Sequence, residues 1–286
     1  MDYDSLKKGI VQLIRKAETE LPADVISALE KAYEVEEGIA KTQIGAILEN
    51  IKLARESNRP MCQDTGIQTF FVTVGVEFPY IDKLRDLIVE GVKTATKEIP
   101  LRPNTVEPFT GENHKDNLGD YIPYITWDFV DGSDVHITAF PKGGGSENMS
   151  KLGMLKPGVG IEGVKDFVVE EMIKAGGNPC PPTVVGVGIG GGADLSLKLG
   201  KKALLRPVGV RHKDKTVAAV EEELIKRIND SGVGPMGLGG KTTVLDVHIE
   251  KAHRHPASLP VGIVVQCWAD RRAGMVIHSD GSWRVE

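Results

Sequence analysis

Three cysteines are the side chains in this sequence whose type and position most invite a chemical interpretation. Cys62, Cys180 and Cys267 are separated by 118 positions (180 − 62) and by 87 positions (267 − 180). Zinc ribbons and ferredoxins use close pairs such as C-x-x-C, so this spacing excludes both. Each cysteine taken singly would more often be a small buried hydrophobic residue. A shared site would have to be assembled in space by the fold.

The surroundings of the three cysteines are alike, which favours a shared site. Each is expected on a loop at the end of a strand, and Cys62 is followed directly by Gln63 and Asp64. Three thiolates suit a [4Fe–4S] cluster with one iron left open, because thiolates are the soft ligands that such clusters require. An open iron can act as a Lewis acid on a substrate hydroxyl and carboxylate. Zinc held by three cysteines is the competing assignment.

Two glycine-rich stretches could bring bare backbone close to a ligand. Residues 178–192 place Cys180 between prolines, ahead of a β-branched run at 183–187 and five glycines. We expect a rigid thiol, a buried strand, a glycine turn and a helix N-terminus, which together could hold a small anion. The three glycines at 143–145 form a second such loop, whose N–H groups could approach a carboxylate. The alternative for that loop is a flexible hairpin end.

Two nucleotide-binding patterns are disfavoured. Residues 186–191 match G-x-G-x-x-G, but about 20 residues further on the charged turn at 211–215 stands where a dinucleotide fold needs an acidic residue at a strand end. The phosphate-loop pattern before Lys241 needs a glycine where Pro235 stands, and a strand is expected after it instead of a helix. Neither stretch predicts nucleotide binding.

Two further polar residues are candidates for a site. His255 stands between Arg254 and Pro256, upstream of the third cysteine, and is the histidine most suited to act as an acid, a base or a hydrogen-bond donor. The other histidines have polar neighbours that favour surface or structural roles. Arg102 lies in a short turn, where a lone arginine is most often solvated.

The hydrophobic pattern predicts an α/β protein with a helical N-terminal segment. Apolar residues recur at three- and four-residue spacing through residues 4–58, and Thr42 is a plausible N-cap for a third helix. Further helices are expected at 81–98, 194–205 and 217–228, and strands at 68–76, 134–140, 183–187, 243–249 and 261–265. We therefore expect a helical segment at 1–58 and an α/β domain at 59–286. That domain could form two lobes, with Gly-rich loops around a cluster site.

The bulk composition is that of a globular protein. The chain has 286 residues, 41% hydrophobic and 26% charged, with a formal net charge of −5. This balance argues against nucleic acid as the main partner, since nucleic-acid binding usually leaves a basic footprint. No apolar run approaches the roughly 20 residues of a membrane helix. The N-terminus lacks the apolar segment of a signal peptide, and three cysteines make no disulfide framework, so we expect a cytoplasmic protein.

Five motifs in order resemble the class I, iron–sulfur fumarate hydratases. More broadly, the chain is similar to the α subunit, or N-terminal region, of the fumarase and L(+)-tartrate dehydratase hydro-lyases. The resemblance covers nearly the whole chain. It rests on these segments: Cys62-Gln63-Asp64-Thr65-Gly66, Lys142-Gly143-Gly144-Gly145-Ser146, Asn178-Pro179-Cys180-Pro181-Pro182, His255-Pro256-Ala257-Ser258-Leu259-Pro260-Val261 and Gln266-Cys267-Trp268-Ala269.

The resemblance implies roles for these residues. Cys62, Cys180 and Cys267 would ligate a [4Fe–4S] cluster. The groups that would face a dicarboxylate substrate are Gln63, Asp64, Arg102, the Gly144 and Gly145 backbone and His255, with Asp64 and His255 as the catalytic pair. Single-chain members of the family continue into a second domain that carries further substrate-binding residues and the base. This chain resembles the two-subunit form, so we expect a separate β subunit in an αβ pair or its dimer.

The expected activity is the reversible hydration of fumarate to (S)-malate, a reaction of the tricarboxylic acid cycle. L(+)-tartrate dehydration is the alternative within the class, since the two substrates differ by one hydroxyl. A metal- or cluster-bearing subunit without turnover is the alternative outside it. The polar groups after Cys62 and around His255 speak against that last reading, because a purely structural site does not need them.

Overall fold

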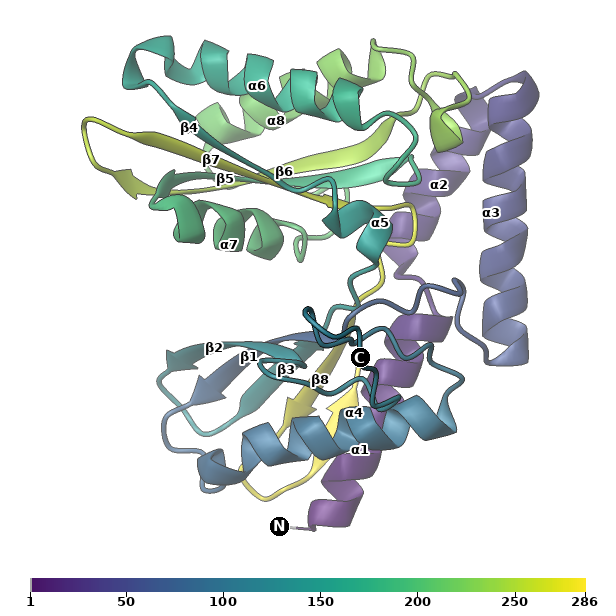
Figure 1. Cartoon of the computed structure of the whole chain (residues 1–286), viewed down its shortest axis with the longest axis vertical. Helices are drawn as coiled ribbons and strands as arrows, with labels where there is room; N and C mark the ends of the chain where they lie inside the picture. Colours follow the sequence, from purple (N-terminus) through teal and green to yellow (C-terminus); the bar gives the residue numbers. More distant parts are fainter. Residues whose placement is uncertain (1) are drawn as a thin grey trace. The chain divides into compact units, whose positions relative to one another are not determined.

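A computed structural model describes residues 2–286 and divides the chain into two compact units (Figure 1). Unit 1 consists of residues up to 22, 50–144 and 271–286, and unit 2 of residues 23–49 and 145–270. The chain thus begins in unit 1 and returns to it twice, after each of the two segments that belong to unit 2. These bounds differ from the expected division at residue 58, because the N-terminal helices are shared between the units.

Unit 1 is built on a five-stranded mixed sheet with the strand order β2-β1-β3-β8-β9. Strands β1 and β2 are parallel, and the other neighbours are antiparallel. The strands are β1 (Thr69–Gly75), β2 (Tyr124–Val130), β3 (Val135–Ala139), β8 (Ala273–Ile277) and β9 (Trp283–Val285). Two long helices, α1 (Tyr3–Thr19) and α4 (Leu84–Glu98), pack against each other and share a core with this sheet. The short helix η1 (Ile81–Lys83) precedes α4.

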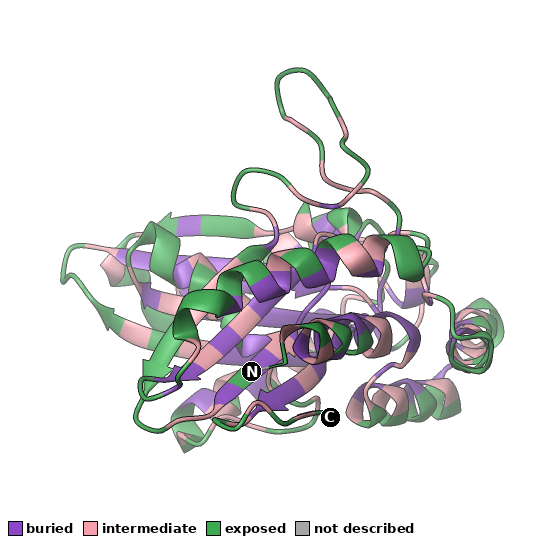
Figure 2. Cartoon of the chain, turned by 90° about the horizontal axis from the view of Figure 1, so that it is seen from below, coloured by how far each residue is buried: buried purple, intermediate pink, exposed green. Residues whose placement is uncertain are grey.

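The core of unit 1 follows from the periodicity of its sequence. Leu6, Ile10 and Leu13 recur at helical spacing on α1 and are fully buried, while Phe70 and Val72 alternate inward along β1. Figure 2 shows helices that are buried along one side and exposed along the other. This pattern fixes which face of α1 meets the sheet, and with it the place of the helix C-terminus.

Unit 2 is a three-layer arrangement around a four-stranded sheet with the order β4-β7-β5-β6. The strands are β4 (Lys151–Leu155), β5 (Thr183–Gly191), β6 (Val244–Arg254) and β7 (Leu259–Gln266). In Figure 1, α6 (Gly160–Ala175) and α8 (Lys215–Asn229) cover one face and α7 (Ala193–Ala203) covers the other. The remaining helices are α2 (Ala23–Val35), α3 (Gly38–Ser57), which contributes to both units, α5 (Gly144–Glu147), η2 (Pro157–Val159) and η3 (Pro235–Gly237).

The glycine run after Cys180 has a packing role that differs from the expected anion-binding turn. Strand β5 continues through these glycines to Gly191. A Cβ at Gly186 would stand 2.0 Å from the Gly200 carbonyl oxygen, and one at Gly188 would stand 1.9 Å from that of Ser196. The glycines therefore let α7 lie directly on the sheet. The expected glycine turn thus begins later than Gly186, because Gly186 and Gly188 remain in the strand and serve close helix–strand contact.

The α/β class and the helical N-terminal segment are confirmed. The third N-terminal helix begins earlier than expected, at Gly38, and Thr42 lies inside it with its hydroxyl bonded to the Gly38 carbonyl at 3.1 Å. Thr42 is therefore not an N-cap, since Ser and Thr can also bond back to the preceding turn within a helix. Among residues 2–286 no helix is both long and apolar enough to cross a membrane.

Candidate functional site

In unit 1, Cys62, Gln63 and Asp64 lie on the loop of residues 61–68, which connects α3 to β1 and is called the arch below. The start of the arch is held by main-chain and amide bonds: the Met61 N–H donates to the Glu18 carbonyl at 3.0 Å, and Asn50 Nδ2 donates to the Met61 carbonyl at 2.8 Å. Cys62 and Asp64 are half-buried and Gln63 is exposed. The arch thus presents a thiol, an amide and a carboxylate in succession.

The Asp64 carboxylate accepts three hydrogen bonds. Its Oδ1 accepts from the Gly66 N–H at 3.0 Å and from Asn104 Nδ2 at 3.2 Å, and its Oδ2 accepts from the Gly144 N–H at 2.8 Å. Gly66 adopts a φ of +70°, and a Cβ there would stand 2.6 Å from the carbonyl carbon of Lys142. Only glycine fits that turn. The carboxylate is therefore held in one orientation by three donors.

Arg102 is joined to the arch through its main chain. Its N–H donates to Thr65 Oγ1 at 3.1 Å, and its carbonyl accepts from Asn117 Nδ2 at 3.2 Å. Asn117 is buried, and its Oδ1 also accepts the Asn104 N–H at 2.7 Å. The Arg102 side chain is exposed and makes no ion pair with any described residue. The structure thus brings Arg102 beside the arch and leaves its guanidinium in solvent.

The three glycines at 143–145 lead into the short helix α5 and do not form a flexible hairpin end. Gly144 and Gly145 are exposed, so their backbone is open on the outer side. The Gly144 N–H is already used by Asp64. The sequence does not reveal the hydrogen bond from the Gly144 N–H to Asp64. It also does not reveal the contacts of Asn104 and Asn117, because asparagines in a long loop carry no distinctive pattern.

A buried ion pair lies beneath the arch, and sequence reasoning missed it as well. Arg271 Nη1 donates to Glu18 Oε2 at 2.6 Å, with side chains 1% and 0% exposed. Gln68 Nε2 donates to Glu18 Oε1 at 3.0 Å. Burial raises the pKa of Glu18, and the Arg271 charge opposes that effect. The chain separation of 253 residues hides this pair from any local sequence pattern.

In unit 2, Cys180 and Cys267 lie at the same end of the sheet. Cys180 precedes β5 and Cys267 follows β7, and these antiparallel strands pair Val184 with Gln266. The Trp268 N–H donates to the Cys180 carbonyl at 3.2 Å, which joins the two loops directly. Cys180 is exposed with a φ of +55°, and Cys267 is half-buried. The expectation that these cysteines stand on loops at strand ends is met by the structure.

His255 lies at the opposite end of the same sheet. It occupies the exposed turn between β6 and β7, while Cys267 follows the other end of β7. Eight residues of extended strand span roughly 25 Å. Within unit 2 the structure therefore does not bring His255 together with the two cysteines. His255 Nδ1 accepts the Ala257 N–H at 3.1 Å, which places the proton of the neutral ring on Nε2.

The donor chemistry of the three cysteines fits an iron–sulfur cluster. No disulfide joins them, and none is buried in a core. Each stands outside the regular helices and strands, on a loop from which its thiol can reach an external group. Among residues 2–286 no group of three or more His, Cys, Asp or Glu side chains is arranged to hold a metal ion. The thiols are thus of the right type and on suitable loops in both units.

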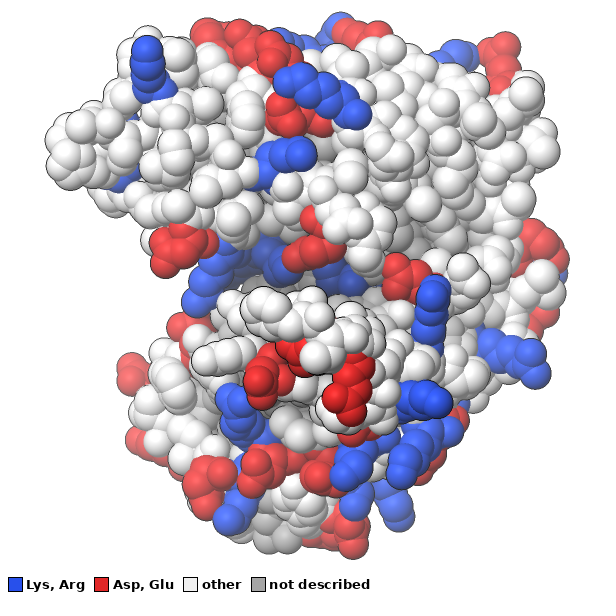
Figure 3. Space-filling view, in the orientation of Figure 1, with Lys and Arg blue, Asp and Glu red and all other residues white. Residues whose placement is uncertain are grey.

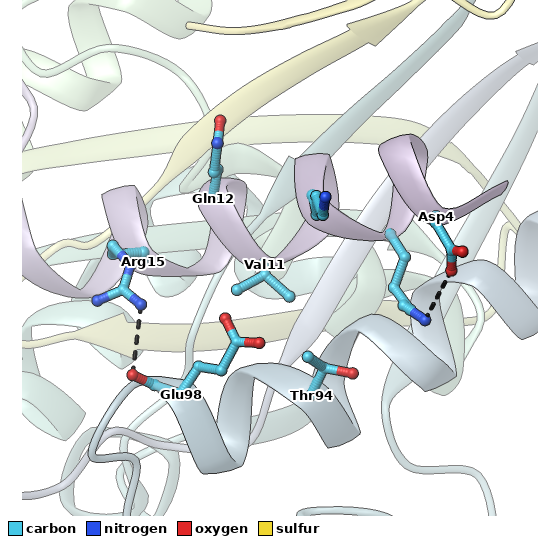
Figure 4. A pocket seen from close by; sticks show the side chains of 8 residues that line it. Asp4, Val11, Gln12, Arg15, Thr94 and Glu98 are labelled. Atoms are coloured by element: carbon cyan, nitrogen blue, oxygen red, sulfur yellow. Dashed lines mark hydrogen bonds and ion pairs between the residues drawn. The ribbon is translucent and has the colours of Figure 1, made fainter. Parts of the chain in front are cut away.

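Two surface hollows lie away from these residues. One, of about 440 Å³, lies between α1 and α4 and is lined by charged side chains (Figure 4). In it Arg15 donates to the Glu98 carbonyl at 3.3 Å, and Lys7 pairs with Asp4 at 3.1 Å. The other, of about 430 Å³, lies in unit 2 beside Asp246. Neither is lined by an expected site residue. On the face drawn in Figure 3, acidic and basic side chains are interspersed.

Comparison with known proteins places the chain in a family. The sequence model of the fumarate hydratase (Fumerase) family matches residues 7–276. A provisionally named L(+)-tartrate dehydratase subunit alpha of Methanocaldococcus jannaschii is 55% identical over 269 residues, which cover 92% of this chain and 94% of the relative. The L(+)-tartrate dehydratase subunits alpha of Escherichia coli (strain K12) and Shigella boydii serotype 4 are each 39% identical over 264 residues, covering 92% of this chain and 87% of each relative.

The match covers almost the whole chain, from α1 through β8, and so includes the arch and both cysteine loops of unit 2. The chain therefore belongs to the fumarate hydratase (Fumerase) family, a family of hydro-lyases.

Proposed function

We propose that this chain is the α subunit of a hydro-lyase that dehydrates L(+)-tartrate. The observation that supports L(+)-tartrate as the substrate is the sequence identity of 55% and 39% to relatives named as L(+)-tartrate dehydratase α subunits, over 92% of this chain. Fumarate and (S)-malate, the first expectation from sequence, become the second candidate. They remain candidate substrates because the matching family is named for fumarate hydratase.

The three cysteines are proposed to hold a [4Fe–4S] cluster. Cys62, Cys180 and Cys267 supply three thiolates, the ligand type that such clusters take. A bound cluster with one iron free of protein thiolate would supply a Lewis acid for a substrate hydroxyl. The Gly66 turn and the Trp268–Cys180 bond support this proposal, since they fix the backbone on which Cys62 and Cys180 stand.

The residues around the arch are proposed to bind and orient the dicarboxylate. Arg102 has an exposed guanidinium without an ion pair in the described chain, which suits bidentate binding of a carboxylate. Gln63 and the exposed backbone of Gly144 and Gly145 add hydrogen-bonding groups. Asp64, held by three donors, would accept a hydrogen bond from a substrate hydroxyl and fix its direction.

Two roles remain for groups outside the arch. His255, which lies at the end of the unit 2 sheet away from Cys180 and Cys267, is proposed as a proton relay, because its Nδ1 is occupied by the Ala257 N–H and its Nε2 carries the proton outward. The base that removes the carbon-bound proton is proposed to belong to a separate β subunit. The naming of the relatives as subunits alpha supports such a partner. A reducing cytoplasm is the proposed compartment, because cluster thiolates must stay reduced.

A substrate panel tests the proposal. The chain would be reconstituted anaerobically with its β subunit and incubated separately with L(+)-tartrate, D-tartrate, meso-tartrate, (S)-malate and fumarate, with products followed by NMR. Turnover of L(+)-tartrate well above that of its stereoisomers is expected. Efficient turnover of (S)-malate and fumarate alone would establish the second candidate instead. A complex that binds iron and sulfide but converts none of the five would favour a non-catalytic cluster-bearing subunit.

A further inference from the structure

The arch that carries Cys62 and Asp64 is held at both ends by one residue, Glu18. Its main-chain carbonyl accepts the Met61 N–H at 3.0 Å, at the start of the arch. Its carboxylate accepts Gln68 Nε2 at 3.0 Å, and the same amide nitrogen reaches the Thr65 carbonyl at 3.3 Å, at the end of the arch. Glu18 stands in the last turn of α1, whose apolar face is anchored in the core. The arch therefore takes its position from α1.

Arg271 is the counter-ion of Glu18 and, like Asp64, comes close to the backbone of Gly143. Its Nη1 donates to Glu18 Oε2 at 2.6 Å. Its Nη2 lies 3.8 Å from the point where a Cβ at residue 143 would stand, and Asp64 Oδ2 lies 3.1 Å from that same point. Residue 143 is a glycine, and a side chain there would meet both the guanidinium and the carboxylate. Arg271 thus pairs with Glu18 beneath the arch and approaches the same glycine as the Asp64 carboxylate.

The charges of Arg271 and Asp64 both act on the protonation of the buried Glu18 carboxyl. Burial raises the pKa of Glu18, Arg271 works against that, and the negative charge of Asp64 raises it further. The two carboxylates are therefore near enough to act on each other. A guanidinium that is 99% buried needs compensating charge, and removal of one partner of such a pair leaves a costly unpaired charge. Arg271 compensates the buried Glu18 carboxylate and lies on the side of it where Asp64 also approaches Gly143.

We propose that Arg271 and Glu18 are positioning residues for the Asp64 carboxylate and the Cys62 arch. This inference rests on the proposed function for its catalytic meaning, but its structural content stands without it. Arg271 acts on Asp64 by charge and on the arch through Glu18 and Gln68. Neither residue needs to touch the substrate. The cluster-binding thiol and the substrate-orienting carboxylate are thereby fixed by the same buried pair.

The first test uses hydrogen exchange in the full-length chain, which needs neither cluster nor partner. The Gly66 and Gly144 N–H groups both donate to Asp64, so their exchange reports whether that carboxylate is in place. In Arg271→Met and in Arg271→Lys we expect both amides to exchange at least ~10-fold faster, while the amides of β1 keep their protection. Arg206→Met, which breaks a second nearly buried pair with Glu221 in unit 2, is the matched control. It should leave these two amides unchanged.

A double variant separates positioning from stability. Glu18→Gln combined with Arg271→Met removes both buried charges, and replacing a buried ion pair by neutral groups is often harmless to stability. We expect its thermal midpoint to return to within ~3 °C of the parent, above both single variants. The Gly144 amide should nevertheless stay exposed to exchange, because the guanidinium proposed to position Asp64 is still absent. Recovery of both stability and amide protection would show a purely structural pair and overturn the inference.

The second test uses the reconstituted enzyme. Arg271→Lys should lower kcat by ~10²-fold, as expected for a small misplacement of a substrate-orienting group. In an Asp64→Asn background the same change should cost less than ~3-fold, because the carboxylate that Arg271 positions is already gone, while a lysine at this place keeps a charge for Glu18 and so keeps the thiol of the arch in place. Additive losses would contradict the inference. If the parent complex turns over no substrate, the proposed function fails, and the hydrogen-exchange test alone decides the role of Arg271.

Discussion

The two regions that present cysteines hold them by different means. In unit 1 the arch of residues 61–68 is fixed by side chains, with Glu18, Gln68 and Asn104 bonded to it. In unit 2, Cys180 and Cys267 stand at the ends of neighbouring strands, and the main-chain ladder of β5 and β7 sets their places. One thiol depends on particular polar side chains, and the other two depend on backbone pairing.

The difference predicts how each region responds to substitution. A side-chain network is sensitive to any change of hydrogen-bonding group, because each buried polar group needs its partner. A strand ladder tolerates many side chains and fails where packing requires a bare backbone, as at Gly186 and Gly188. Substitutions of the half-buried and exposed side chains of the arch should therefore alter activity more than stability, and those in β5 should alter stability more than activity.

The largest expected effect comes from the cysteines themselves. Cys62→Ala and Cys180→Ala should each abolish stable iron binding and all turnover, because the proposed cluster needs the thiolate of each of these residues. The circular dichroism spectrum should change little, since neither residue belongs to a core. Iron retained at the parental level in either variant would remove that cysteine from the ligand set.

Loss of the arch carboxylate should have the next largest effect. Asp64→Asn should lower kcat by ~10²–10³-fold, because an amide cannot accept the same bonds from Gly66, Asn104 and Gly144 and orient a hydroxyl. The free energy of unfolding should fall by less than ~1 kcal/mol, as the residue is half-buried. Asp194→Asn, an exposed carboxylate in the first turn of α7, is the control and should keep full activity. Full activity of Asp64→Asn in the reconstituted complex would refute its assigned role.

A change in β5 tests the other half of the comparison. Gly188→Ala would place a Cβ 1.9 Å from the Ser196 carbonyl oxygen, so we expect a loss of about 3 kcal/mol in unfolding free energy from overpacking. Activity per folded molecule should stay near the parental value. Gly158→Ala, where a Cβ would meet nothing within 4 Å, should change stability by less than ~0.5 kcal/mol. Equal stabilities in chemical denaturation would contradict the packing role of this glycine.

The smallest effect is a difference in pH dependence. Burial alone would raise the pKa of Asp246 in unit 2, but His248 and Arg211 hold that pKa below its usual 3.8. Asp246 therefore contributes stability that is present above pH 3.8 and is lost as the pH falls through its lower folded value. The raised pKa of Glu18 has the opposite sign, with a contribution present below pH 4.5 and lost as the pH rises through the folded value.

Urea denaturation between pH 3 and pH 7 measures both contributions. Asp246→Asn should lose less stability than the parent as the pH falls below about 4. Glu18→Gln should lose less than the parent as the pH rises above about 5. Parallel curves for the parent and both variants would show that neither carboxyl has a shifted pKa.

Sequence reasoning captured what depends on local pattern. The helical spacing of Leu6, Ile10 and Leu13 and the run after Gln68 gave the N-terminal helix and β1 correctly. The cysteines were placed on loops at strand ends because β-branched runs stop beside them. The glycines at 186 and 188 were misread, since a glycine required for helix contact and one required for a turn look the same in sequence.

What the sequence could not reveal are contacts between distant segments. Glu18 and Arg271 are 253 positions apart, and Asp64 and Gly144 are 80 apart, so no window of sequence contains either pair. His255 was interpreted with the third cysteine because they are close along the chain. Only twelve positions separate them in the sequence, but the intervening strand β7 is extended and places them at opposite ends of the sheet in unit 2.

The most direct test of the account is the metal content of the anaerobically reconstituted chain. Iron and acid-labile sulfide would be counted, with the visible spectrum, for the parent and for alanine variants of Cys62, Cys180 and Cys267. We expect about four of each per chain in the parent and a loss in all three variants. A parent that takes up zinc and resists iron reconstitution, or a variant that keeps the full complement, would contradict the proposal that these three cysteines hold a [4Fe–4S] cluster.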